Sequence, residues 1–213
     1  MRRFEPQKHG RFAQGYTRIE ILALYGSACL LDEAISGDRK AARARMVDTV
    51  RLERGRRIVE PMRWGLIPGW WQLGIEPTNP VAFNAPADIV AKAPLFQSSV
   101  SRRHCLIPAS GFYELARGRA PYYFTRRDGS LMTIAGLWDE WRHPDTKELI
   151  RSCAAVVGAP CRSIAELNGF MPIMLEPGQF ELWLSGEPGL KLMKSIGQTE
   201  PGRYLTWKSV EMV

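Results

Sequence analysis

Residues 122–134 read Tyr-Tyr-Phe-Thr-Arg-Arg-Asp-Gly-Ser-Leu-Met-Thr-Ile, which is the clearest local signal in the chain. Two runs rich in aromatic and β-branched residues flank Asp128 and Gly129. This pair adopts more easily than most others the positive φ angles of a type I′ turn. The stretch therefore predicts a β-hairpin and indicates that strands build the fold.

Further strands are expected on both sides of this hairpin. Residues 57–64 predict a strand that enters a Gly/Pro-rich bend over residues 65–69. Residues 103–114 contain Pro108 and Gly111, which is typical of two strands joined through a kink or a bulge. Three more segments are predicted as strands: residues 152–157, 171–175 and 204–210.

Helices are predicted to be few and peripheral. Thr17 and Glu20 match a capping box, in which the two side chains satisfy free backbone donors at a helix start. A helix is expected from about Arg18 as far as Leu31, with short helices over residues 177–184 and 190–196. Because strands dominate and no regular βαβ alternation occurs, we expect an α+β fold with a β-barrel-like, mainly antiparallel core.

Size and composition bound the class of protein. A chain of 213 residues with 45% hydrophobic residues is expected to bury one sizeable core, so residues 1–213 are predicted to form a single domain. No apolar run approaches the roughly 18 residues of a membrane span, and no secretory pattern stands at the N-terminus. We expect a cytoplasmic protein. The four cysteines form no C-x-x-C pair and are expected to be reduced and mostly buried.

The net charge of +7 favours partners that carry phosphates, because neutralised phosphates release condensed counterions. Residues 39–57 hold eight Lys or Arg and two acids. This segment is predicted as a helical or loop insert that leads into an edge strand. It has two interpretations: a solvated basic face, or a surface that tracks phosphates.

Five motifs occur together in the chain: His-Gly-Arg-Phe-Ala at residues 9–13, MRWGLIPGWW at 62–71, FNA at 83–85, RRHCLIPASGFYE at 102–114 and AGLW at 135–138. Their joint occurrence in this order resembles the SOS-response-associated peptidase family, also called abasic-site processing proteins. The resemblance covers Gly10 to about Leu184 and implies the fold of that family.

The resemblance implies chemistry at an N-terminal cysteine, whose thiol and α-amine close on the aldehyde of an abasic site to give a stable thiazolidine. In this chain His9 stands at the cysteine's position, eight residues after Met1, so the cross-link is predicted to be absent. Asn84 matches the family asparagine that holds the terminal group and the lesion. Glu114 matches the acid/base that opens the sugar ring.

Other positions depart from the family pattern. Asn168 stands where the family has a catalytic histidine, and Phe170 stands where it has a DNA-binding arginine. Pro86 replaces a further arginine that contacts DNA, and Asp88 falls near a usual glutamate. These losses together favour drift or repurposing of the site over full retention of activity.

Elements for DNA binding are expected to remain. Arg11 matches the arginine beside the lesion and is suited to bidentate phosphate contact. Trp70 matches an aromatic residue on which a base stacks, and Trp71 is its neighbour. Since two adjacent indoles on a loop do not easily both face a core, at least one is predicted to be exposed. The other tryptophans expected in the core are Trp64, Trp138, Trp141 and Trp183.

Three functions follow as hypotheses. The first is a monomeric protein that binds single-stranded or junction DNA at abasic lesions, with cross-linking lost or altered. The second is a residual lyase or peptidase that uses Glu114, with His9 or a lysine amine forming an imine. The third is a non-enzymatic paralogue with a repurposed protein- or ligand-binding pocket. No metal site and no cofactor are expected, because the three histidines are scattered along the chain.

Overall fold

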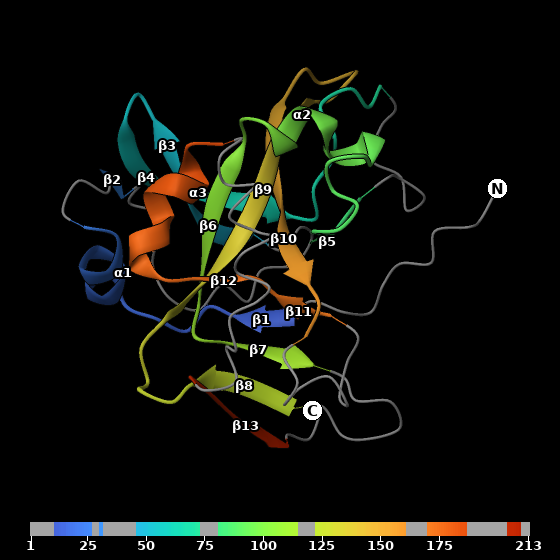
Figure 1. Cartoon of the computed structure of the whole chain (residues 1–213). Helices are drawn as coiled ribbons and strands as arrows, with labels where there is room; N and C mark the ends of the chain where they lie inside the picture. The colour runs from blue at the N-terminus through green and yellow to red at the C-terminus, as the bar shows by residue number, and fades with distance from the viewer. Residues whose placement is uncertain are drawn as a thin grey trace.

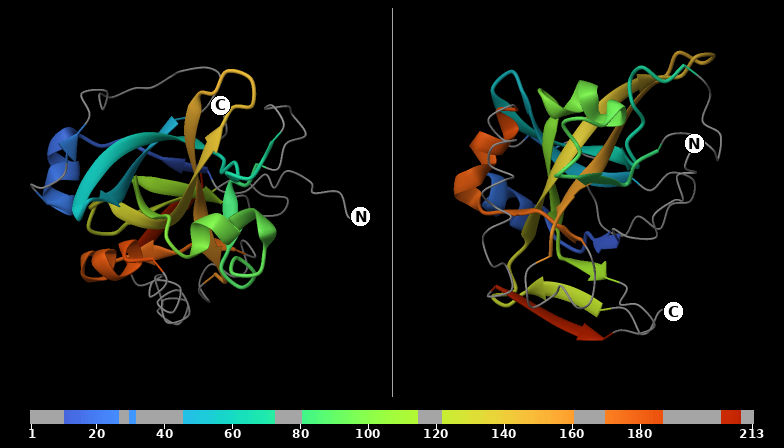
Figure 2. Two further views of the ribbon diagram at one scale, coloured as in Figure 1. Left: turned by 90° about the horizontal axis from the view of Figure 1, so that it is seen from above. Right: turned by 45° about the vertical axis from the view of Figure 1, so that its right-hand side comes forward.

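The strands form two sheets. A computed structural model describes residues 11–26, 30–31, 46–72, 81–114, 122–160, 170–186 and 204–209. Among these residues, one sheet has nine strands and the other has four. Figures 1 and 2 show the larger sheet wrapped around itself and the smaller one lying across one end of it.

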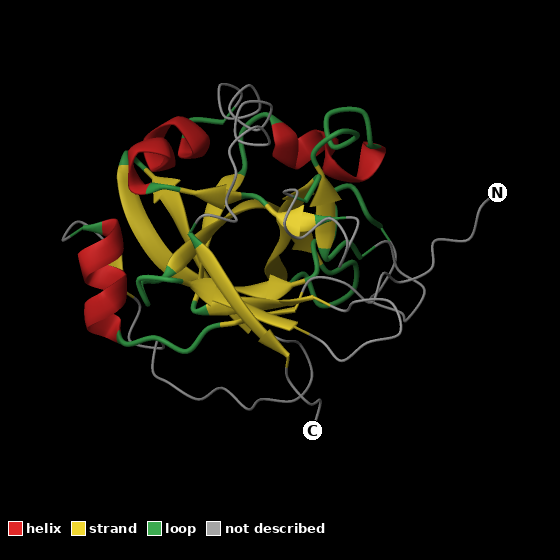
Figure 3. Cartoon of the chain, turned by 60° about the horizontal axis from the view of Figure 1, so that its bottom comes forward, coloured by secondary structure: helices red, strands yellow, loops and turns green. Residues whose placement is uncertain are grey.

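Five strands of the larger sheet close into a barrel, which appears as a ring of strands in Figure 3. The order β10-β4-β3-β6-β9 is completed by pairing of β9 with β10. Closure removes the unpaired edges that an open sheet would expose. The five strands are β3 (Met46–Glu53), β4 (Arg56–Trp64), β6 (His104–Ala109), β9 (Met132–Arg142) and β10 (Leu149–Gly158).

Most neighbouring strands of the barrel run antiparallel, and four short strands pair with the barrel strands to extend the sheet. The exception within the barrel is the parallel pair of β4 and β10. The short strands are β2 (Leu30–Leu31), β5 (Asn84–Pro86), β11 (Met171–Pro172) and β12 (Met174–Leu175). The α+β fold with a β-barrel-like, mainly antiparallel core is therefore confirmed.

The smaller sheet has the order β1-β7-β8-β13. Its register places a row of aromatic residues on one face, where Phe12, Phe112, Phe124 and Trp207 pair in succession across the strands. The rings of Phe112 and Phe124 stack with centroids 4.9 Å apart. The strands are β1 (Arg11–Ala13), β7 (Gly111–Glu114), β8 (Tyr122–Arg126) and β13 (Leu205–Ser209).

Helix α1 (Arg18–Tyr25) begins at the predicted capping box, since the Thr17 side chain accepts from the Glu20 amide and the Glu20 carboxylate accepts from Thr17. The prediction that it continues to Leu31 was wrong. The helix ends before Gly26, and Leu30 pairs in strand β2.

Two further helices follow 3-10 turns. The first turn is η1 (Pro94–Phe96), which leads into α2 (Gln97–Val100), and the second is η2 (Pro177–Gln179), which leads into α3 (Phe180–Leu184). The latter pair confirms the helix predicted over residues 177–184. The helices lie outside the ring of strands in Figure 3. They are peripheral, as expected.

Two clusters of buried side chains divide the core. The outer cluster includes Ile21 of α1, Val100 of α2 and Trp183 of α3, so it lies between these helices and the outer wall of the barrel. The inner cluster takes side chains from all five barrel strands and from the smaller sheet. Its members include Phe12, Val47, Met62, Trp64, Cys105, Ile107, Phe112, Phe124, Ile134, Cys153, Ala155 and Met171.

The predicted hairpin over residues 122–134 was wrong, although both of its strands exist. β8 pairs with β7 and β13, whereas β9 pairs with β6, β10 and β12. A type I′ turn needs positive φ at both central residues, but only Gly129 has it, at 72°. The Asp128 carboxylate instead accepts from the amide and hydroxyl of Ser130. The turn therefore passes the chain from one sheet to the other.

The predicted edge strand after the basic segment was also wrong. β3 lies between β4 and β6, because its register pairs Val50 with Val59 on one side and with Leu106 on the other. Residues 39–45 and the helix predicted over residues 190–196 lie outside the described residues. Within the described part of the chain, no helix is both long and apolar enough to cross a membrane.

Candidate functional site

The segment that carries Arg11 runs beside the strand that carries Glu114. In β1, Arg11 pairs with Tyr113, the residue before Glu114. Glu114 itself pairs with Tyr122 and is only 3% exposed. It is a buried carboxyl, which differs from the ordinary exposed glutamate of a surface strand. His9 and the side chain of Arg11 lie outside the described residues.

Asn84 is the first residue of β5, which runs parallel to β10. Asn84 pairs with Ala155, and the Ala155 amide donates to the Phe83 carbonyl at 3.0 Å. The Asn84 side chain is half-buried. Pro86 ends the strand opposite Val157, so the position that departs from the family pattern is part of the sheet.

Three aromatic rings connect these two regions. Phe12, next to Arg11, meets Trp64 with ring centroids 4.8 Å apart, and Trp64 lies 6.1 Å from Phe83, the residue before Asn84. Met171 belongs to the same inner cluster, and Tyr122 packs against it. The segments that carry Arg11, Asn84 and Glu114 thus converge on one apolar cluster. Asn168 lies outside the described residues, and Phe170 is 42% exposed where the chain is again described.

Residues 65–71, called here the tryptophan loop, follow directly after β4. Leu66 exchanges backbone hydrogen bonds with Ala82, at 2.8 and 3.1 Å, which joins the loop to the segment leading into Asn84. The first half of the loop is buried, whereas Trp70 is 52% exposed. Trp71 is half-buried and meets Trp70 edge to face at 6.1 Å. The prediction that at least one of the two indoles is exposed is confirmed.

The remaining tryptophans lie largely as expected. Trp64, Trp141 and Trp183 are buried. Trp138 is half-buried between two guanidinium groups, those of Arg51 and Arg103, which lie 5.2 and 5.6 Å from its ring centroid. Both arginines also form ion pairs with carboxylates, and Arg151 joins the same network. The pairs are Arg51 with Glu53 and Glu60, Arg103 with Asp139 and Glu140, and Arg151 with Glu60 and Glu140.

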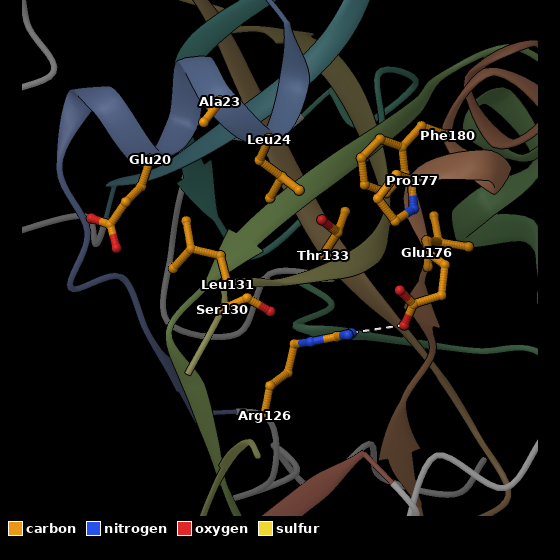
Figure 4. A pocket seen from close by; sticks show the side chains of 11 residues that line it. Glu20, Ala23, Leu24, Arg126, Ser130, Leu131, Thr133, Glu176, Pro177 and Phe180 are labelled. Carbon is orange, nitrogen blue, oxygen red and sulfur yellow. Dashed lines mark hydrogen bonds and ion pairs between the residues drawn. The ribbon is translucent and has the colours of Figure 1, made fainter. Parts of the chain in front are cut away.

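A pocket of about 340 Å³ opens elsewhere, between α1, the turn after β8 and η2 (Figure 4). Its floor is apolar, and the ion pair of Arg126 with Glu176, at 2.7 Å, stands at one side. Arg126 also pairs with Asp128, and Glu20 is engaged by Thr17. Its charged groups are therefore already paired with neighbours. None of the described residues that line it is a predicted site residue.

Comparison with known proteins decides the family. A sequence profile described as SOS response associated peptidase (SRAP) matches residues 9–213. The chain belongs to the SRAP family. The resemblance noted from the motifs is thereby confirmed, and the match extends beyond Leu184 to the last residue given.

Curated relatives of this SRAP chain are named abasic site processing proteins. YoqW of Bacillus subtilis is 28% identical over 128 residues, which are 58% of this chain and 56% of that protein. HMCES of Pongo abelii is 26% identical over 196 residues, which are 74% of this chain and 53% of that protein. The chain spans about half the length of these relatives.

Two crystal structures share the SRAP chain's fold. A protein from Bacteroides thetaiotaomicron has a TM-score of 0.78 at 20% identity, covering 94% of this chain and 91% of that one. A protein from Bordetella bronchiseptica has a TM-score of 0.74 at 22% identity, covering 95% and 99%. At these identities the likeness shows the fold alone.

Sequence reasoning missed the residues that hold the tryptophan loop of this SRAP chain. The fully buried Asp139 accepts from the Gly69 amide at 2.9 Å, and Ser152 accepts from the Ile67 amide at 2.8 Å. Asp139 comes directly after the AGLW motif, which ends at Trp138. An acidic residue between Trp138 and Trp141, two tryptophans expected in the core, was the available signal.

Proposed function

We propose that this SRAP chain acts as one unit over residues 1–213 and binds single-stranded or junction DNA at abasic sites, as a monomer and without a cysteine-dependent cross-link. The observation that supports this most is Trp70. An indole that is 52% exposed, on a loop whose first residues are buried and hydrogen-bonded, presents ring surface on which a base can stack. The names of YoqW and HMCES agree with an abasic-site substrate.

Asn84 and Glu114 are proposed as the groups that meet the lesion. The two belong to different sheets, but their neighbours Phe83 and Tyr122 pack against the same inner cluster. An amide supplies both a donor and an acceptor to the open sugar. A carboxyl that is 3% exposed is shielded from bulk water and can exchange a proton with a bound sugar.

The loss of the cross-link rests on His9 and Asn168. The family profile begins at His9, which supports the alignment of this residue with the family cysteine. An imidazole has no adjacent amine and thiol with which to close a thiazolidine ring. Asn168 cannot exchange a proton near neutral pH as the family histidine does. We therefore expect reversible binding to the lesion.

Charge supports a nucleic-acid partner for the same site. The net charge of +7 favours polyanions, and Arg11 belongs to the strand beside Glu114. Guanidinium groups bind phosphate through paired N–H donors. Affinity for single-stranded DNA is therefore expected to fall as salt rises, with a slope of roughly −0.7 per phosphate contacted in a plot of log K against log salt.

A second candidate function is a lyase that retains Glu114 as its acid/base. The burial of Glu114 favours it, because an ordinary surface glutamate would have no reason to lie at 3% exposure. An amine of the protein would add to the aldehyde with loss of water, and the carboxylate would take the proton whose removal lets the adjacent phosphate leave. Strand cleavage that disappears in Glu114→Gln distinguishes this candidate.

The experiment titrates the full chain into two fluorescently labelled single-stranded DNAs, one with a single abasic site and one intact. Fluorescence anisotropy reports binding at several salt concentrations. The proposal expects salt-dependent binding to both strands and tighter binding to the abasic one. Equal affinity for the two would argue against recognition of the lesion. Absence of binding at low salt would favour a repurposed pocket.

A further inference from the structure

One carboxylate joins three separate segments beneath the tryptophan loop. Asp139 of β9 is fully buried and accepts from the Gly69 amide through Oδ2, at 2.9 Å. The hydroxyl of Ser98 in α2 donates to the same oxygen. Oδ1 pairs with Arg103 and accepts from the Glu140 amide at 2.8 Å. The two oxygens therefore tie the loop, helix α2 and the start of β6 to one point.

The loop is fastened to the barrel on both sides of this point. Before it, the Gly65 amide donates to the Cys153 carbonyl at 3.0 Å, and the Ile67 amide donates to Ser152 at 2.8 Å. After it, the Trp141 indole donates to the Trp71 carbonyl at 2.6 Å. Each contact comes from β9 or β10. Trp70 is thus an exposed side chain on a segment whose backbone is hydrogen-bonded to β9 and β10.

Gly69 lies too close to β9 for any side chain. A Cβ at this position would lie 2.6 Å from the Glu140 carbonyl oxygen and 3.2 Å from Asp139 Oδ1. The close approach is what lets the Gly69 amide reach the carboxylate. The absence of a side chain at Gly69 and its hydrogen bond to Asp139 therefore both fix the position of the next residue, Trp70.

We infer that Asp139 is a positioning residue that holds Trp70 in the orientation in which it stacks on a base of the bound DNA strand. The inference rests on the proposed function, since it concerns how that site engages DNA. A buried carboxylate with three donors and an arginine has one arrangement that satisfies all of them. A loop fixed in this way loses less freedom on binding than a mobile one, which favours affinity.

The test combines a loop measurement with a binding cycle in the full chain. Asp139→Asn replaces one carboxylate oxygen, which accepts hydrogen bonds, with an amide group that donates them. This group would face the N–H and O–H donors that Asp139 now binds. Asp145→Asn is the matched control, because Asp145 is exposed on the turn between β9 and β10 and carries the same charge. Gly69→Ala is a second variant that displaces the loop with Asp139 intact. Amide hydrogen exchange over residues 65–71 measures how often the loop opens in the absence of DNA.

We expect faster exchange over residues 65–71 in Asp139→Asn and Gly69→Ala but not in Asp145→Asn. For the abasic single strand, Trp70→Ala and Asp139→Asn should each weaken binding by about tenfold. The double variant should be no weaker than Trp70→Ala alone, a coupling that general destabilisation would not produce.

Four results would overturn the inference, and they are separable. Unchanged exchange in Asp139→Asn would show that the carboxylate does not hold the loop. Faster exchange in Asp139→Asn with wild-type affinity for DNA would show that holding the loop does not affect binding. Additive losses of affinity in the double variant would show that Asp139 does not act through Trp70. A wild-type chain that binds no single strand would refute the proposed function itself, and this inference with it, whatever the exchange shows.

Discussion

Phe12 of β1 and Trp64 of β4 meet edge to face, with ring centroids 4.8 Å apart and ring planes at 87°. This contact joins the smaller sheet to the barrel at the point where the segments carrying Arg11 and Asn84 come together. An edge-to-face aromatic pair contributes beyond the area that it buries. The candidate site therefore depends on a packing contact between two residues that are themselves buried.

Removal of the Phe12 ring should destabilise the fold. Phe12 is 6% exposed, so Phe12→Ala is expected to lower the free energy of unfolding by about 3 kcal/mol through lost burial and the cavity left behind. Urea denaturation followed by circular dichroism measures this. Ile19→Ala, at a helix position that is 78% exposed, is the control and should change it by less than about 0.5 kcal/mol. Equal effects of the two would refute the packing role.

Substitution of Trp70 should separate binding from stability. Because the side chain is 52% exposed, Trp70→Ala is expected to leave the melting temperature unchanged while costing roughly 1–3 kcal/mol of binding to single-stranded DNA. Trp70→Tyr should recover part of the affinity, since a phenol ring also stacks. Tyr204→Ala, at an aromatic residue that is 59% exposed and precedes β13, is the control. A loss in the control as large as that in Trp70→Ala would indicate a nonspecific effect.

Stability should fall at mildly acidic pH because of His104. Its ring nitrogens face the carbonyl oxygens of Trp183 and Val100 at 2.7 and 2.8 Å, and its burial lowers its pKa below 6.5 despite these contacts. The unfolded chain thus binds the proton more readily than the folded one. The stability is fully present above pH 6.5 and is lost as the pH falls through the folded-state pKa.

Thermal melts between pH 8 and pH 5 check the effect of His104. The variant His104→Gln keeps a donor for one of the carbonyl oxygens but does not titrate. It should therefore show a flatter dependence of melting temperature on pH than the wild type. Parallel curves for the two proteins would assign the acid sensitivity to other groups.

The sequence signals that succeeded are local ones. The capping box at Thr17 and Glu20 depends on residues three positions apart, and the family motifs lie within short segments. The hairpin prediction failed because Asp128 and Gly129 specify a turn but not the partners of the strands around it. The partners of β8 are set by the aromatic row of the smaller sheet.

The role of Asp139 in holding the tryptophan loop could not be predicted either, because its partners lie far away in the sequence. Asp139 meets Gly69 from 70 residues away and Ser98 from 41. No pattern within a short window links these positions. The exposure of at least one of the two adjacent indoles was predictable because the steric limits on such a pair are local, whereas the contacts that hold the loop of Trp70 are tertiary.

Introduction of an N-terminal cysteine should allow a cross-link to abasic DNA if the rest of the pocket is intact. In a variant that lacks residues 2–8 and carries His9→Cys, removal of the initiator methionine leaves a free thiol beside a free amine. We expect an adduct with abasic single-stranded DNA that survives denaturing electrophoresis. The matched control has the same deletion and retains His9, and it should form none. No adduct in either variant would place the defect elsewhere, for example at Asn168.

The most direct measurement incubates the full chain with single-stranded DNA that carries one abasic site, beside intact DNA, and runs native and denaturing gels in parallel for the wild type and Glu114→Ala. The account predicts a salt-sensitive shift on the native gel, stronger for the abasic strand, and free DNA of full length on the denaturing gel. A wild-type adduct that survives denaturation, or strand cleavage that requires Glu114, would contradict the claim that the chain binds the lesion without covalent chemistry.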